Sequence, residues 1–259
     1  MNKRKVPKIR FKGFYDDWEQ RKLKVLSDFI TKGATPTTYG FEWQSSGIPF
    51  FRNDAIKDNQ FVYGDYSYIS EEANESLKRS EIHADDILIA ITGEIGKVGI
   101  IPKNVIKGNI NQHTARVRVV KEAIPYFVYQ SLATENQQRK YQLIKTGLSM
   151  PQLSLEQIRE TVVSCPSMGE QYKIGSYFQS LDHLITLHQR KLGLLKRLRN
   201  SLIDRCFIGE KYTMSKKILY HGSPNRVIVP KFGFGENRHD YGREFYLTEN
   251  LKLAEEWAE

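Results

Sequence analysis

The chain has 259 residues, of which 40% are hydrophobic and 12% aromatic. These fractions exclude an intrinsically disordered protein, and the length is enough for one large domain or two smaller ones. Lysine and arginine outnumber aspartate and glutamate by 39 to 30, which gives a net charge of +9. This excess makes nucleic acid or another anionic surface a candidate partner.

The positive charge is distributed unevenly along the chain. Residues 1–167 carry +5, residues 168–213 carry +4, and residues 214–259 are neutral. The sequence from Met214 onward reads like the start of a separate module; the alternative is an ordinary linker followed by a strand. The basic excess therefore belongs to the first 213 residues.

Several classes of protein are excluded by simple counts. Cys165 and Cys206 are far apart, which argues against a disulfide scaffold or a thiolate zinc site. The basic N-terminus lacks the apolar run of a signal peptide, and no stretch approaches the ~18 apolar residues of a membrane span. We therefore expect a cytoplasmic protein that binds no membrane and no metal.

The first predicted element is a helix over residues 18–30, because Leu23, Leu26 and Ile30 recur at roughly helical spacing. A polar loop is expected over 31–38. Strands are predicted over 48–52, 87–91, 98–101 and 115–119, with 87–91 and 98–101 forming a buried pair.

Helical character returns over residues 125–144, with Phe127, Leu132 and Tyr141 as candidate anchors. A loop is expected over 147–152, a short helix over 155–159, and a strand at 162–163. Together these elements predict a mixed α/β unit.

The segment from Glu170 to Phe207 predicts one long helix. It contains no proline, and apolar or semi-apolar residues recur in steps of four and three over about five heptads. Such a helix would span roughly 55–60 Å and would need a partner helix. The predicted seam, which also includes Cys206, comprises Ile174, Phe178, Leu181, Ile185, His188, Leu192, Leu195 and Leu202.

The sequence contains no run that matches the spacing of a known catalytic motif. The run from Thr92 to Gly99 superficially resembles a phosphate loop, but its glycine spacing is wrong and Val98 stands where Ser or Thr is needed. A tight turn with glycines at positive φ is the better interpretation. Asp85 and Asp86 are better explained as a polar turn than as metal ligands.

Loops of the first 167 residues carry side chains that suit DNA. Asn and Gln can read adenine and Arg and Lys can read guanine, while Lys and Ser suit phosphates. The alternative is that these loops are merely polar. The candidate DNA-binding residues are Lys32, Arg52, Asn53, Lys97, Asn111, Gln112, His113, Lys145, Ser149 and Gln152.

In order and spacing, several segments resemble the specificity subunit of type I restriction-modification systems. The resemblance covers about residues 6–208 and is carried by residues 6–11, 18–23, 47–52, 86–90, 96–99, 111–112, 152–155, 166–174 and 181–192.

The resemblance implies a non-catalytic subunit without cofactors. Such a subunit reads a bipartite target in double-stranded DNA through two recognition domains, held apart by antiparallel long helices, and recruits adenine-methylating and ATP-dependent restriction subunits. This chain departs from the pattern, with one recognition domain (1–167) and one long helix (168–208). It is therefore expected to act as a half-subunit, as a homodimer or paired with another half.

After a linker over 209–217, residues 218–259 resemble the start of a small ADP-ribosyltransferase-like family. The match rests on the segments 219–223, 229–230, 240–249 and 254–258. The resemblance implies that His221 and Tyr246 correspond to the NAD-gripping residues, while the catalytic glutamate would lie beyond Glu259. We expect a truncated, inactive α/β fragment; an appendage without function is the alternative.

Two other hypotheses remain open. The chain could be an ADP-ribose-transferring enzyme with a DNA-targeting module, which requires NAD turnover that depends on His221. It could also be a coiled-coil interaction protein that dimerises without binding DNA.

Overall fold

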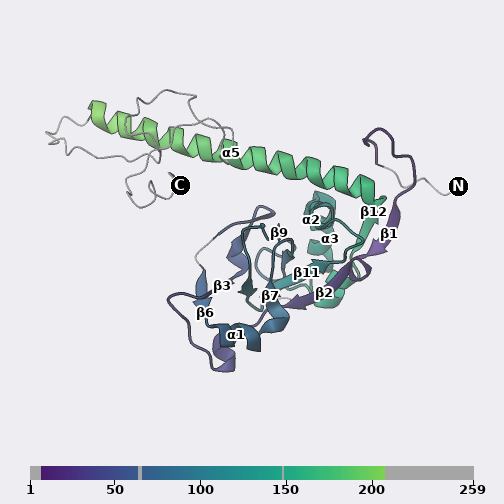
Figure 1. The fold of residues 1–259 in the computed structure, drawn as a ribbon, viewed down its shortest axis with the longest axis horizontal. Helices are drawn as coiled ribbons and strands as arrows, with labels where there is room; N and C mark the ends of the chain where they lie inside the picture. Colours follow the sequence, from purple (N-terminus) through teal and green to yellow (C-terminus); the bar gives the residue numbers. More distant parts are fainter. Residues whose placement is uncertain (1–6, 64–65, 148, 208–259) are drawn as a thin grey trace, which may run out of the picture. The chain divides into compact units, whose positions relative to one another are not determined.

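The computed structural model describes residues 7–63, 66–147 and 149–207 (Figure 1). The chain divides into two compact units, residues 1–193 and 194–259. The predicted linker and the tail with His221 and Tyr246 lie outside the described residues. Among the helices of the described part, none has the length and apolar composition that crossing a bilayer requires.

The predicted helix over 18–30 is wrong. This segment forms strand β1 (Glu19–Lys22), the 3-10 helix η1 (Leu23–Val25) and strand β2 (Ser27–Lys32). β1 pairs antiparallel with β12 (Val162–Cys165). The apolar residues are buried as expected, but pairing with a strand distant in sequence outweighs a weak local preference for helix.

One four-stranded sheet has the order β2–β11–β8–β9 and is antiparallel throughout. Its strands include β8 (Ile87–Ala90), β9 (Val98–Ile100) and β11 (Thr114–Val119). Ile87 lies opposite Ile100, so the predicted pair of buried strands is confirmed.

The second four-stranded sheet has the order β6–β3–β10–β7 and is mixed. β3 and β10 run parallel, whereas the other neighbours are antiparallel. The predicted mixed α/β architecture is thus confirmed. The strands of this sheet are β3 (Ile48–Phe51), β6 (Ser67–Ile69), β7 (Glu81–Ile82) and β10 (Gly108–Ile110), and a separate pair is formed by β4 (Ile56–Lys57) and β5 (Gln60–Phe61).

The continuous apolar run of β8 follows from its position between two cores. Ile87 and Ile89 belong to the core that contains α2 residues, while Leu88 and Ala90 belong to a core shared with the second sheet. Because successive side chains of a strand point to opposite faces, a strand covered on both sides needs apolar residues at every position.

The helical region predicted over 125–144 is two helices, α2 (Pro125–Ala133) and α3 (Glu135–Ile144). Thr134 separates them, and its hydroxyl accepts a hydrogen bond from the Gln137 amide as the N-cap of α3. The predicted anchors of this region, Phe127, Leu132 and Tyr141, are all buried.

Five short helical elements complete the body: α1 (Glu71–Ser76), α4 (Leu155–Arg159) and the 3-10 helices η2 (Pro36–Tyr39), η3 (Asn53–Ala55) and η4 (Lys78–Ser80). The predicted helix over 155–159 is confirmed, and it begins with a reciprocal capping box between Ser154 and Gln157.

The long helix α5 (Met168–Phe207) has 40 residues, as the heptad pattern predicts. In the larger unit its first turns lie beside α2 (Figure 1). Asp182 accepts hydrogen bonds from Tyr126 and Gln130, at 2.6 and 2.7 Å. The Arg10 guanidinium forms two 2.7 Å hydrogen bonds with the buried carboxylate of Glu170.

The solvent exposure of the predicted seam residues increases along α5. Ile174 packs against the core and Leu181 is half-buried. Ile185 and Leu192 are exposed. The seam residue His188 is also exposed, and its ring bonds to the Leu184 carbonyl of its own helix. The exposed seam residues beyond Leu181 are Ile185, His188, Leu192, Leu195 and Leu202, and Phe178 is 41% exposed.

The two cysteines are both free and lie in different environments. Cys165 is buried in β12 and Cys206 is exposed on α5. Burial raises the pKa of the Cys165 thiol to about 11, so it is an inert core residue at neutral pH.

Candidate functional site

The ends of several strands meet at one edge of the body. The Ala34 amide, just after β2, donates to the Ile110 carbonyl at 3.2 Å, and the Asn111 amide donates to the Phe51 carbonyl at 3.2 Å. The segments that follow β2, β3 and β10 are therefore neighbours.

Two further segments join this edge. The Ile91 amide donates to the His113 carbonyl and the Leu153 amide donates to the Ile91 carbonyl, both at 3.0 Å. The end of β8 and the end of the 145–152 loop thus lie beside the segment 111–113. We call the segments 33–35, 52–53, 91–93, 111–113 and 152–153 the strand-end cluster.

Gly33 permits the closest approach in the strand-end cluster. A Cβ atom at this position would lie 1.9 Å from the Ile110 carbonyl oxygen and 2.3 Å from that of Asn111. Only glycine can occupy a position where two backbones approach this closely.

A chain of hydrogen bonds connects four side chains of the strand-end cluster. The Thr35 hydroxyl bonds to Gln112 Oε1, and Gln112 Nε2 lies 3.1 Å from His113 Nε2. His113 Nδ1 in turn lies 2.9 Å from the Thr92 hydroxyl. Gln112 is exposed, whereas the other three side chains are half-buried. Gln112 is therefore the member of the chain that faces solvent.

Arg52 is exposed but held on two sides. Its guanidinium donates to the Ser67 hydroxyl at 3.2 Å and lies 5.7 Å from the ring centroid of Trp43. Beside it, the Asn53 amide nitrogen is so near the β8–β9 turn that a Cβ on Gly93 would lie 3.2 Å away. The structure thus brings Arg52, Asn53, Gln112 and His113 together.

Asn111 differs from its neighbours in the strand-end cluster. Its side chain is buried, and its oxygen accepts hydrogen bonds from the His113 amide and the Thr114 hydroxyl. Because these contacts satisfy the oxygen inside the protein, we assign Asn111 to holding the turn and leave it out of the proposed DNA-reading residues.

The β8–β9 turn is tight, as predicted, with Gly93 at φ 69° and Gly96 at φ 86°. Lys97 is half-buried there and shares a shallow depression with residues of α3. Lys145, at the end of α3, donates to the Gln142 side chain at 3.0 Å. Both lysines lie on the α3 side of the turn.

The remaining candidates are exposed: Lys32 at the end of β2, and Ser149 and Gln152 in the loop that follows α3. The backbones of Thr146 and Gln152 pair across this loop. Sequence reasoning missed Thr35, Thr92 and Trp43, which contact the candidates; their order in the sequence carries no signal of this, since the contacts join different loops.

The Asp85–Asp86 pair is a structural turn, as interpreted from the sequence. Asp86 is buried and accepts two hydrogen bonds from Arg118, at 2.8 and 2.7 Å. Asp85 adopts φ 67°. Within the described residues, no group of three or more acidic, histidine or cysteine side chains is arranged to hold a metal ion.

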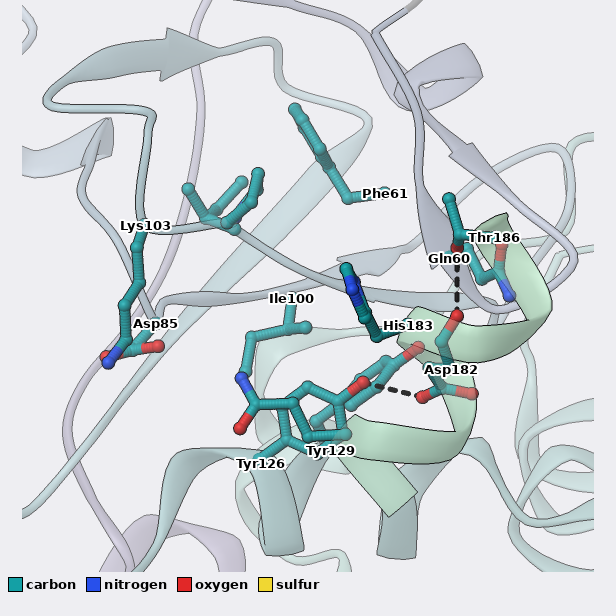
Figure 2. Close-up of a pocket in the computed structure, with 13 residues that line it drawn as sticks. Gln60, Phe61, Asp85, Ile100, Lys103, Tyr126, Tyr129, Asp182, His183 and Thr186 are labelled. Carbon is teal, nitrogen blue, oxygen red and sulfur yellow. Dashed lines mark hydrogen bonds between the residues drawn. The ribbon is translucent and has the colours of Figure 1, made fainter. Parts of the chain in front are cut away.

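A separate cavity of about 440 Å³ lies between α2, α5 and the segment 100–103 (Figure 2). Figure 2 shows Tyr126 pointing toward Asp182, with Tyr129, His183 and Thr186 nearby. Burial and the Asp182 carboxylate raise the pKa of the Tyr126 phenol, so it stays protonated and donates to Asp182. The hydrogen bond between Tyr126 and Asp182 attaches α5 to the body.

A family model described as the type I restriction modification DNA specificity domain matches residues 15–197. The chain belongs to this family. Specificity subunits are among its relatives: it is 25% identical over 206 residues to the EcoBI specificity subunit of Escherichia coli, covering 75% of this chain and 42% of the relative. It is 22% identical over 215 residues to the MjaIX specificity subunit of Methanocaldococcus jannaschii, covering 82% and 49%.

Solved structures share the fold of this specificity domain. The type I S subunit from M. genitalium matches with a TM-score of 0.54 at 16% identity, covering 80% of this chain and 49% of that one. A chain from a structure of type I R-M complex assembly and conformational transition matches with a TM-score of 0.52 at 17% identity, covering 78% and 48%. At such identities the likeness shows the fold alone.

The chain spans about half the length of the curated relatives it matches. The relatives' names as specificity subunits agree with the expectation of a non-catalytic recognition component. A second family model, described as a protein of unknown function (DUF3990), matches residues 217–259. It supports a separate C-terminal module but does not name an ADP-ribosyltransferase.

Proposed function

We propose that the chain is the DNA-reading component of a type I restriction-modification complex. The observation that carries the proposal is the strand-end cluster, which brings Arg52, Asn53, Gln112 and His113 together in a member of a DNA specificity family. Side chains of these types can read base edges in the major groove. Lys32, Lys97, Lys145, Ser149 and Gln152 supply phosphate contacts around them.

The partners of this component follow from the same proposal. In this proposal the chain is the non-catalytic component, while methyltransferase subunits modify adenine and restriction subunits cleave DNA with ATP, in the cytoplasm. The recognition domain comprises residues 1–167 and the helix residues 168–208, with residues 209–217 as a linker to the C-terminal module.

We also propose that α5 pairs with a second long helix, from another copy of this chain or from a different half-subunit. The exposed apolar seam supports this, because Ile185, Leu192 and Leu195 repeat at heptad spacing and are each about half exposed. A symmetric pair would read a symmetric, interrupted DNA site. Unchanged dimerisation of a chain truncated at Pro166, measured by light scattering, would contradict this arrangement.

DNA selection tests the central proposal. The full chain, with its methyltransferase subunits, is incubated with a randomised duplex library, and bound sequences are read; a defined consensus is expected. Arg52→Ala should weaken binding to the consensus about tenfold. Lys121→Ala is the matched control, because Lys121 is exposed beyond the opposite end of β11. A wild-type chain that enriches no sequence would contradict the proposal.

For residues 218–259, the ADP-ribosyltransferase resemblance stays a prediction carried by His221 and Tyr246. The fragment is expected to be inactive, whereas the alternative of an ADP-ribose-transferring enzyme requires that the full chain turn over NAD. NAD turnover that His221→Ala abolishes would contradict the inactive fragment and support that alternative.

A further inference from the structure

The hydrogen-bond chain through Gln112 leaves a defined set of groups on its side chain. A carboxamide has two N–H donors and an oxygen with two acceptor positions. Thr35 occupies one acceptor position and His113 Nε2 takes one N–H. One donor position and one acceptor position therefore remain on this exposed amide.

Gln112 keeps one free donor and one free acceptor position in both possible orientations of the hydrogen-bond chain. Reversing the amide makes His113 Nε2 donate to the oxygen and makes the nitrogen donate to Thr35. The Thr92 hydroxyl accommodates either tautomer of His113, because a hydroxyl both donates and accepts. In each direction Gln112 again retains one free N–H and one free acceptor position.

One base matches this pair of groups in the major groove. Adenine presents an acceptor, N7, beside a donor, the N6 amino group. Guanine presents two acceptors there, cytosine one donor and thymine one acceptor. An amide with one donor and one acceptor remaining is complementary to adenine alone.

We propose that Gln112 reads an adenine in double-stranded DNA, and that Thr35, His113 and Thr92 are positioning residues that hold its carboxamide in place. This inference rests on the proposed function and adds a named base and a named reader to it. Holding the amide beforehand reduces the rotamer entropy lost on binding, so the positioning residues strengthen the contact without touching DNA.

The packing around the hydrogen-bond chain supports the distinction between one reading residue and three positioning residues. Thr35, His113 and Thr92 come from three different strand ends and are half-buried. Gly33 lets the Thr35 segment approach the carbonyls of Ile110 and Asn111, and buried Asn111 accepts from the His113 amide. These contacts fix the backbone segments that carry the side chains of the hydrogen-bond chain.

The test uses the full chain with its methyltransferase subunits and the consensus duplex obtained from a randomised library. Single base-pair variants of that duplex are then compared by competition binding. Gln112→Ala should reduce discrimination at one A·T pair about tenfold. Binding to unrelated DNA and its salt dependence should stay unchanged, because glutamine carries no charge.

Thr35→Val and Thr92→Val should each reduce discrimination about threefold at that same pair, because they loosen a paired base contact without removing it. In the Gln112→Ala background, Thr35→Val should have no further effect, since it acts only through Gln112. Thr38→Val is the matched control: Thr38 is an exposed residue of η2, three positions after Thr35, and should change nothing.

Each of the other outcomes contradicts one specific part of the proposal. Full adenine discrimination by Gln112→Ala would overturn the assigned reader. Loss in Gln112→Ala without loss in Thr35→Val, or a Thr35→Val effect that persists beside Gln112→Ala, would overturn the positioning role. Failure of the wild-type chain to select any sequence would overturn the proposed function itself and the inference with it.

Discussion

At the scale of single residues, a buried polar network supports the mixed sheet β6–β3–β10–β7, one of the two sheets whose strand ends form the strand-end cluster. The Glu81 carboxylate on β7 accepts hydrogen bonds from Asn74, Lys78 and the His83 ring. Asn74 in turn accepts from Asn109 on β10 at 3.0 Å. Because Asn74, Glu81 and Asn109 are all buried, each depends on the others for its hydrogen bonds.

The network predicts an acid-dependent stability. Burial alone would raise the pKa of Glu81, but hydrogen bonds from Asn74, His83 and Lys78 outweigh it and lower the pKa below 4.5. Since the folded pKa lies below the unfolded one, the stabilisation is present above pH 4.5 and is lost as the pH falls through the folded pKa.

Chemical denaturation from pH 7 to pH 3 measures this dependence. We expect the free energy of unfolding of the wild-type chain to fall more steeply below pH 4.5 than that of Glu81→Gln, which cannot titrate. Parallel pH profiles for the two proteins would contradict the assignment.

The close approach at Gly33 predicts a severe effect of a single methyl group. Gly33→Ala should lower the free energy of unfolding by about 3 kcal/mol or more, because the Ile110 and Asn111 carbonyls must move. Gly193→Ala is the control: a Cβ there meets nothing within 4 Å, and alanine should stabilise α5 by about 0.5–1 kcal/mol. Urea unfolding of both variants measures the difference; similar values would contradict the prediction.

At the scale of elements, the N-terminal segment attaches the start of α5 to the body. Phe11 contacts Tyr177 edge to face, and Lys173 lies 5.1 Å from the Phe14 ring centroid. With the buried pair of Arg10 and Glu170, these contacts fix the beginning of the helix.

Removing one partner of the buried pair should be costly. Arg10→Ala leaves the Glu170 carboxylate buried without its cation, and should lower the free energy of unfolding by about 3 kcal/mol. Arg21→Ala, which breaks a more exposed pair with Glu19, should cost less than about 1 kcal/mol. Thermal unfolding of the two variants tests this, and equal losses would show that the Arg10 pair adds little.

At the scale of the whole molecule, the seam of α5 beyond Leu181 is an exposed apolar stripe. Thirteen side chains of this helix are large, hydrophobic and exposed, among them the seam residues Ile185, Leu192 and Leu195. A helix of this composition is unfavourable in water unless a partner buries its apolar stripe.

Charge on the seam should therefore prevent pairing. If α5 pairs with a second copy of the chain, as proposed, the double variant Ile185→Asp/Leu192→Asp should shift the full chain from dimer to monomer in sedimentation velocity. Leu194→Asp is the matched control, because Leu194 is 64% exposed but lies off the heptad seam. Dissociation by Leu194→Asp, or a stable dimer in the double variant, would show that a different surface mediates association.

Local sequence patterns are sufficient to predict those elements whose structure depends mainly on their own residues. The apolar run of β8, the tight glycine turn after it and the 40 residues of α5 all follow from period and composition. The first segment was misread, because β1 is specified by pairing with β12 rather than by its own residues. Of the DNA-reading candidates, Asn111 is buried, which depends on contacts that composition does not express.

The sequence by itself determined the family, the mixed α/β class and the heptad repeat, because these are written in the order and period of residues along the chain. Only the tertiary structure decided that the segments around Thr35, Arg52, Thr92 and Gln112 share one edge. Hydrogen bonds between strand ends bring them together. These bonds join residues that are far apart in the sequence, so the sequence alone does not show that they are close in space.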